Sequence, residues 1–143
     1  MKKILLNIIA TLFLLTSFCY AAQFPDKNNM DSVDWTYGGT TGTAITFYYA
    51  PSLTTLSPQG KLETWIKMVI KDSNGNVTET DIGHNFVNYT FENYKEIESL
   101  EYDSDGKLRA DYSYTDANWK NMPDGTPFES TLQSALQYVK DNQ

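Results

Sequence analysis

The feature that most constrains the fold of this chain is a pattern that occurs twice, in which a strand-like stretch ends at a turn rich in Asp, Asn and Gly. The stretch 61–71 has an apolar residue at every second position, and Asp72-Ser73-Asn74-Gly75-Asn76 follows it. The strand-like stretch 94–102 leads into Asp103-Ser104-Asp105-Gly106, after which 107–114 alternates again. A period of two is typical of strands with one buried face, and such turns join antiparallel neighbours. We therefore expect an antiparallel sheet.

The remaining stretches add strands and one ambiguity. Residues 43–49 place Ile45, Phe47 and Tyr49 on one face, and 86–91 is also strand-like. In 61–71 the face that carries Ile66 is predicted to be core, and the face that carries Trp65 is predicted to be an amphipathic surface. The stretch 77–84 is polar, and we interpret it as either a loop or a weak edge strand. This gives about five to six strands.

The C-terminal part changes to a helical period. Thr126-Pro127-Phe128-Glu129 has the form of a capping box with proline at the first helical position. The apolar residues that follow recur at the spacing of one helix face, namely Phe128, Leu132, Ala135, Leu136 and Val139. Strands followed by a helix predict an α+β domain, in which the antiparallel sheet packs against a C-terminal α-helix.

The N-terminus has the anatomy of a secretory signal peptide. Two lysines precede an apolar stretch at 4–15, and small residues then permit cleavage after Ala21, plus or minus one residue. An alternative makes Cys19 the lipidated first residue of a lipoprotein, although the bulky Phe18 precedes it. We expect a signal peptide at 1–21, a flexible leader at 22–34 and one domain at 35–143. Sec-dependent export would deliver the domain to the periplasm, the cell surface or the medium.

Charge and cysteine content narrow the possible partners. The chain carries 11 basic and 18 acidic residues, and loss of Lys2 and Lys3 with the signal leaves nine basic residues and a net charge of −9. This excess of acid argues against a nucleic-acid partner, whose binding depends on neutralising phosphates. The mature chain would have no cysteine and therefore no disulfide or thiolate site. No apolar run after the signal reaches the ~18 residues of a spanning helix, so no transmembrane segment is expected.

The candidate chemical motifs are weak. His84 is the only histidine, and we expect it on the surface or in a loop. The sequence from Glu101 to Gly106 imitates the start of a calcium loop, but Tyr112 stands where the twelfth-position Glu belongs. The sequence therefore predicts no catalytic, cofactor-binding or metal-ligating residue, and we expect no cofactor and no enzymatic activity. Exposed Tyr or Trp side chains are the better candidates for binding, without an assigned ligand site.

Several motifs in order resemble the surface-adhesin protein E family of bacteria. The match spans roughly Trp35 to Val139. The motifs are Tyr48-Tyr49-Ala50-Pro51-Ser52-Leu53, Glu63-Thr64-Trp65-Ile66-Lys67, Tyr102-Asp103-Ser104-Asp105-Gly106, and Trp119 with Met122-Pro123-Asp124-Gly125-Thr126. The resemblance implies a curved antiparallel sheet packed on a C-terminal helix. It also implies a role at the cell envelope, with host matrix proteins such as vitronectin and laminin, or plasminogen, as partners.

Two departures from the family pattern qualify the expected function. Relatives commonly join the central strand to the final helix by a disulfide, whereas the stretches around Asn93 and Val139 hold no cysteine. The family's matrix-binding stretch is basic, whereas residues 76–85 contain Glu79 and Asp81 and no Lys or Arg. We expect an exported, non-enzymatic binding domain with a host matrix or envelope protein as partner. The alternative is a periplasmic acidic inhibitor or accessory factor that binds a basic protein.

Overall fold

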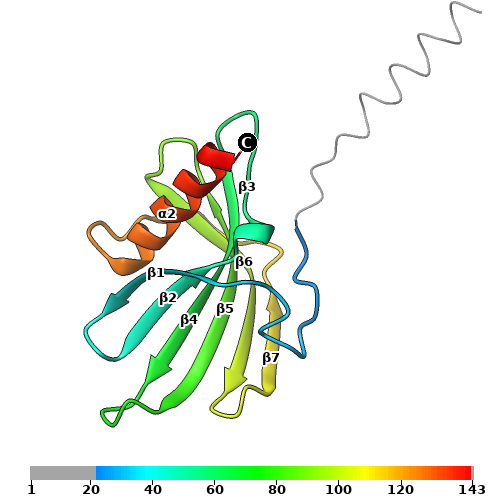
Figure 1. Ribbon diagram of the computed structural model, residues 1–143. Helices are drawn as coiled ribbons and strands as arrows, with labels where there is room; N and C mark the ends of the chain where they lie inside the picture. The colour runs from blue at the N-terminus through cyan, green and yellow to red at the C-terminus, as the bar shows by residue number, and fades with distance from the viewer. Residues whose placement is uncertain (1–21, 143) are drawn as a thin grey trace, which may run out of the picture.

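The computed structural model describes residues 22–142, and the expected signal peptide, with Cys19, lies outside them. Six strands in the order β1-β2-β4-β5-β6-β7 form one antiparallel sheet that curls beside an α-helix (Figure 1). Two short strands extend it, because β3 pairs with β4 and β8 pairs with β6. The elements are β1 (Thr36–Thr41), β2 (Ile45–Tyr49), the 3-10 helix η1 (Pro51–Leu53), β3 (Thr55–Leu56), β4 (Leu62–Lys71), β5 (Val77–Val87), β6 (Asn93–Asp103), β7 (Leu108–Ser113), β8 (Lys120–Asn121) and α2 (Pro127–Asn142). The predicted α+β class and strand number are confirmed.

The two Asp- and Gly-containing turns are built in the same way. In the β4–β5 turn the Gly75 amide donates to the Asp72 carbonyl at 3.1 Å, and Asp72 Oδ1 accepts from the amides of Asn74 and Asn76 at 2.8 and 2.9 Å. Asp103 Oδ1 accepts in the same way from Asp105 and Lys107 in the β6–β7 turn. Gly75 has a φ of 85°, whereas Asn74 has no positive φ. The β4–β5 turn is therefore a type I turn with a glycine bulge, although Asn-Gly in hairpins commonly forms a primed turn.

The helix α2 covers one face of the sheet, here called the inner face. Leu132 and Ala135 of α2 are fully buried against Phe47, Leu62 and Ile66. The predicted apolar face of the helix is therefore confirmed. At its start, the Thr126 hydroxyl accepts from the Glu129 amide at 3.2 Å as in a capping box. The Glu129 carboxylate, however, accepts from the Gly125 amide at 2.7 Å.

The opposite, outer face is covered by residues 22–35, which we predicted as a flexible leader as far as residue 34. Phe24 is only 3% exposed and packs on Trp65, with ring centroids 5.2 Å apart. Residues 22–34, predicted as a flexible leader, therefore pack on the sheet, because a polar sequence without periodicity can dock through one aromatic anchor. The same contact buries Trp65 completely, so the outer face of β4 is core here and not the amphipathic surface expected.

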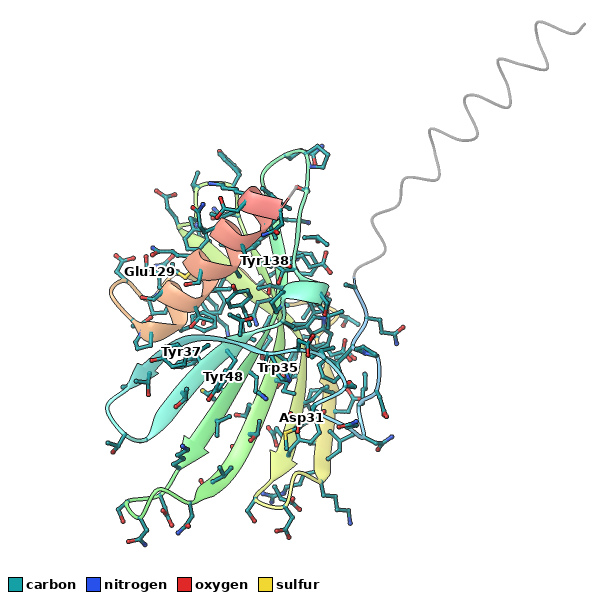
Figure 2. All side chains as sticks on the ribbon, in the orientation of Figure 1. Asp31, Trp35, Tyr37, Tyr48, Glu129 and Tyr138 are labelled. Carbon is teal, nitrogen blue, oxygen red and sulfur yellow. The ribbon has the colours of Figure 1, made fainter. Side chains whose placement is uncertain are left out.

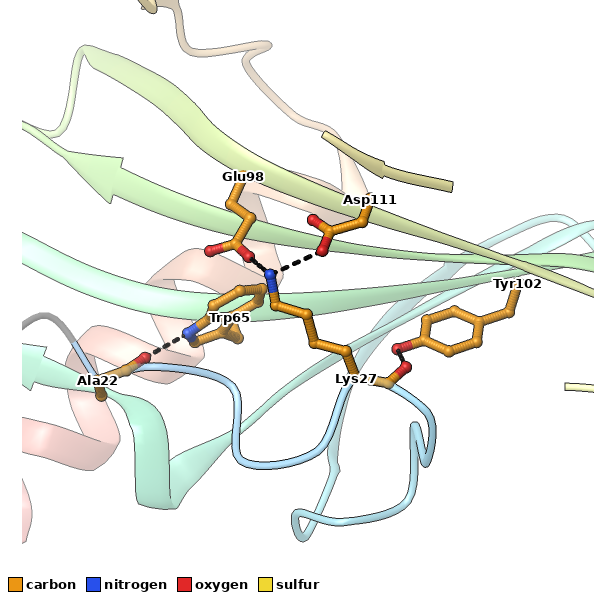
Figure 3. A network of polar contacts seen from close by, with 6 residues as sticks. All are labelled: Ala22, Lys27, Trp65, Glu98, Tyr102 and Asp111. Atoms are coloured by element: carbon orange, nitrogen blue, oxygen red, sulfur yellow. Dashed lines mark hydrogen bonds and ion pairs between the residues drawn. The ribbon is translucent and has the colours of Figure 1, made fainter. Parts of the chain in front are cut away.

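Polar contacts fasten this N-terminal segment to three strands (Figure 3). The Trp65 indole N–H donates to the Ala22 carbonyl at 2.7 Å, and the Tyr102 hydroxyl donates to the Lys27 carbonyl at 2.9 Å. The Lys27 ammonium lies between the carboxylates of Glu98 and Asp111, the latter at 2.9 Å. Burial opposes the charge, but the two carboxylates outweigh it and raise the pKa of Lys27.

An exposed part of the outer face centres on a second lysine. Lys67 Nζ lies 4.8 Å from the ring centroid of Trp35 and 5.3 Å from that of Tyr48, and it pairs with Asp31 at 3.5 Å. Tyr37 contacts Tyr48 edge to face, at 6.1 Å (Figure 2). Burial lowers the pKa of Lys67, and Asp31 opposes that shift. The N-terminal segment therefore contributes both apolar and ionic contacts to this face.

The strand β5 corrects another expectation. Residues 77–84 were interpreted as a loop or a weak edge strand, but β5 is central and pairs with β4 and β6 along most of its length. Its outer residues Thr80, Ile82 and His84 are buried under the N-terminal segment and neighbouring aromatics. Polar residues occupy its inner face, and this hid the strand from an analysis of hydrophobic period.

Among residues 22–142, no helix has the length and apolar character needed to span a membrane.

Candidate binding cavity

A cavity of about 600 Å³ lies between the inner face of the sheet and the first turn of α2. Six strands, the loop before α2 and the start of α2 contribute to its wall, so the curl of the sheet and the position of the helix together create it. The lining residues include the polar group Asp81, Gly83, Asn85, Glu96, Ser99 and Lys120 and the apolar group Phe47, Ile66, Met68, Tyr94 and Phe128.

The floor of the cavity is the inner face of β5. Asp81, Gly83 and Asn85 fall at every second position, so they share this face. Gly83 pairs with Ser99 on one side and with Ile66 on the other. A Cβ atom at Gly83 would overlap the Glu96 carboxylate and lie 3.1 Å from Asn85 Nδ2. The glycine therefore keeps room for the Glu96 carboxylate beside Asn85.

Two buried oxygen atoms at this floor have no hydrogen-bond partner among the described residues. Asn85 is 1% exposed, and its Nδ2 donates to the Gly83 carbonyl at 2.9 Å, while its Oδ1 is unpaired. Asp81 Oδ1 is likewise buried and unpaired. Buried polar atoms in native proteins are nearly always paired, so each of these oxygens requires a donor from elsewhere. Both residues line the cavity.

The two acids of the cavity hold their protons more strongly than ordinary carboxyl groups. Burial, followed by the nearby charges of Glu79 and Glu101, raises the pKa of Asp81 from 3.8 to about 6. Burial also raises the pKa of Glu96, and Lys120 opposes this while Asp81 adds to it. Groups with shifted pKa values in a cleft are candidates for a functional site.

The rest of the lining is apolar and aromatic. The rings of Tyr94 and Phe128 meet edge to face at 5.0 Å, and Phe47 and Phe128 meet at 6.1 Å. Ile66 and Met68 of β4, which pair with Gly83 and Asp81, extend this apolar surface beside the floor. A cavity with a broad apolar wall and a few polar groups is the usual form of a small-ligand site.

A second hollow of about 490 Å³ adjoins the first, and Glu96 and Lys120 line both. It lies against the segment 113–118, near the exposed ring of Tyr114. The rings of Tyr112 and Tyr114 stack at 6.4 Å. Lys120 and Glu96 therefore lie between the two hollows.

The histidine singled out in the sequence lies elsewhere. His84 is 2% exposed on the outer face of β5, stacks on Trp65 at 4.4 Å, and places Nε2 2.8 Å from Glu63 Oε1. The expectation of a surface or loop histidine was therefore wrong. Because successive residues of a strand point to opposite faces, His84 does not share the cavity with Asp81 and Asn85.

The sequence did not identify the cavity residues. Asp81 and Glu96 are separated by a turn, and only the pairing of β5 with β6 brings them to one site. A usable signal was the run Asp81-x-Gly83-x-Asn85, which has a strand period with polar residues. Within residues 22–142, no group of three or more His, Cys, Asp or Glu side chains is arranged to hold a metal ion.

The predicted aromatic candidates divide between core and surface. Tyr49 and Trp65 are buried, whereas Tyr37, Tyr112, Tyr114 and Trp119 are exposed. Tyr48 is half-buried beside Lys67. Trp119 contacts the Lys95 ammonium, which lies 5.2 Å from its ring centroid. Tyr112 and Tyr114, whose rings stack, therefore form an exposed aromatic pair that is available to a partner.

A scan against protein-family models found no matching family, and searches of curated proteins and of solved structures found no match either. The resemblance to the surface-adhesin protein E family therefore depends on the motifs quoted above.

Proposed function

We propose that this chain is a non-enzymatic binding domain that holds an apolar part of its ligand in the cavity between the sheet and α2. The observation that carries the proposal is a cavity of about 600 Å³ with unpaired oxygens at its floor. Small-ligand sites commonly measure ~300 to 1,000 Å³. The hollow is therefore large enough to hold a small ligand.

A neutral apolar probe tests this function. N-phenyl-1-naphthylamine fluoresces in apolar surroundings, and we expect the purified protein to bind it saturably. Ser99→Phe should weaken the probe's binding at least tenfold, because Ser99 lies on the cavity floor and a phenyl ring would fill the space. Ser104→Phe in the exposed β6–β7 turn is the matched control and should bind like the wild type. Unchanged binding by a folded Ser99→Phe variant would contradict the proposal.

A second candidate function is recognition of a protein partner at the cell envelope, as the adhesin E resemblance implies. It is favoured by the exposure of Tyr112, Tyr114 and Trp119, at 45, 43 and 46%, beside the edge strand β7. Exposed Tyr and Trp often dominate the energy of protein interfaces. In this hypothesis the domain is exported and the partner is a host matrix or envelope protein; an acidic inhibitor of a basic protein is the alternative.

Salt dependence separates these protein partners. The purified protein would be assayed against vitronectin, laminin and a cationic secreted enzyme at low and moderate salt. Binding through the aromatic surface should be lost in Tyr112→Ser and should vary little with salt. Binding driven by the net charge should weaken steeply as salt rises and should survive that substitution.

A further inference from the structure

We propose that the ligand of the cavity is an organic cation, with a primary ammonium group at Asp81, Asn85 and Glu96 and a hydrocarbon body against the aromatic wall. This inference depends on the proposed function, because it assigns the chemical class of the ligand that the cavity takes.

The floor offers acceptors without matching donors. Asp81 Oδ1 and Asn85 Oδ1 are both buried and unpaired, and the amide nitrogen of Asn85 is already committed to the Gly83 carbonyl. The Glu96 carboxylate lies beside the same glycine. A primary ammonium has three donors and no acceptor, so it suits a site that offers acceptors alone. A hydroxyl has one donor and would leave acceptors unpaired.

Charge favours a cation for a separate reason. Asp81 and Glu96 line the cavity with carboxylates, and Glu79 and Glu101 add negative charge close to Asp81. Lys120 is the one basic side chain among the lining residues; it is exposed and lies near Glu96. A buried carboxylate gains a partner when an ammonium binds, and this is the condition under which burial of a charge is tolerated.

The shape of the site explains the hydrocarbon part. Phe47, Ile66, Met68 and Phe128 lie around the remaining wall, and none of these side chains can bond to a polar group. The ligand class that fits both ends is therefore an amine with an alkyl or aryl body, not a free metal ion and not an anion.

Three probes of equal chain length separate the contribution of the ammonium group from that of the hydrocarbon body. Octylamine, octanol and octanoate would compete with N-phenyl-1-naphthylamine at pH 8, which is above the pKa of about 6 of Asp81 and at which the amine is charged. We expect octylamine to bind at least tenfold more tightly than octanol, and octanoate to bind more weakly than either. Octylamine should also lose affinity as the pH falls through about 6, because Asp81, which faces Glu79, Glu101 and Glu96, then takes up a proton.

Substitutions in the cavity test where the ammonium group of the ligand binds. Asp81→Asn should reduce octylamine affinity about tenfold and leave octanol within twofold, and Glu96→Gln should act in the same direction. Glu101→Gln is the matched control, because it removes a neighbouring charge that does not line the cavity, and it should change octylamine binding less than threefold. If Asp81→Asn does not fold, Glu96→Gln alone tests the position of the ammonium group.

Any other outcome would contradict either the assignment of an amine or the proposed function. Equal affinity for octylamine and octanol, or tighter binding of octanoate through Lys120, overturns the assignment of an amine while leaving the apolar site intact. An equal loss with Glu101→Gln would show a general effect of charge and would also overturn it. If N-phenyl-1-naphthylamine itself does not bind, the proposed function fails together with this inference.

Discussion

At the scale of single residues, Asp81 shows most clearly that a side chain suited to a binding site can destabilise the fold. Its side chain is half-buried on the inner face of β5, with one unpaired oxygen and a pKa raised from 3.8 to about 6. A pKa raised by folding means that the folded state favours the protonated form. Ionisation of Asp81 therefore opposes folding: this destabilisation is absent below about pH 4 and is complete above about pH 6.

Asp81→Asn should accordingly stabilise the free protein at neutral pH. We expect the melting temperature to rise by about 4 °C at pH 7.5, which corresponds to about 1 kcal/mol after allowance for solvent screening of a half-buried group. At pH 3.5 the variant and the wild type should melt together. Asp105→Asn in the exposed β6–β7 turn is the control. A lower melting temperature for Asp81→Asn at pH 7.5 would mean that the carboxylate has a stabilising partner.

The cavity residues also show why the site could not be predicted from the sequence. Asp81, Gly83 and Asn85 are polar or small, and in a strand such residues normally indicate a solvent-facing side or a loop. Glu96 reaches them only because β6 is in register with β5, with Asn85 opposite Glu96 after a bulge. That register depends on the whole sheet, so no local pattern contains it.

At the scale of elements, the sequence predicted most of the structure because turns and caps are local. The two Asp-x-x-Gly turns and the helix start at Thr126-Pro127 depend on hydrogen bonds within five residues. The strand β5 was not predicted because its apolar residues face the N-terminal segment, whose position could not be predicted from the sequence. The helix was predicted more accurately because its apolar face contacts the sheet core directly.

The cap of α2 gives an element-scale prediction. Thr126→Ala should lower the free energy of unfolding by about 1 kcal/mol, since the Thr126 hydroxyl accepts from the Glu129 amide and donates to the Pro123 carbonyl at 2.7 Å. Ser130→Ala, on the exposed side of the same turn, should cost less than about 0.5 kcal/mol. Urea unfolding measures both. Equal effects of the two substitutions would mean that Thr126 does not begin the helix.

At the scale of the whole molecule, the two faces of one sheet are covered by opposite ends of the described chain. The helix α2 covers the inner face and leaves the cavity, whereas residues 22–35 cover the outer face. Trp65, Ile82 and Leu100 are fully buried only because that segment is docked. The N-terminal segment is therefore part of the domain, and the cavity is open on the face where the helix, not the segment, forms the wall.

Phe24→Ala tests this assignment. Truncation of a buried phenylalanine costs about 3 to 5 kcal/mol, because it removes the packing against Trp65 and leaves a void. Gln23→Ala, at the exposed neighbouring position, is the control and should change the unfolding free energy by less than about 0.5 kcal/mol. Urea unfolding followed by tryptophan fluorescence reports both stability and the environment of Trp65. If Phe24→Ala unfolds like Gln23→Ala, the segment is the flexible leader that its polar sequence suggested, and the outer face of the sheet needs another cover.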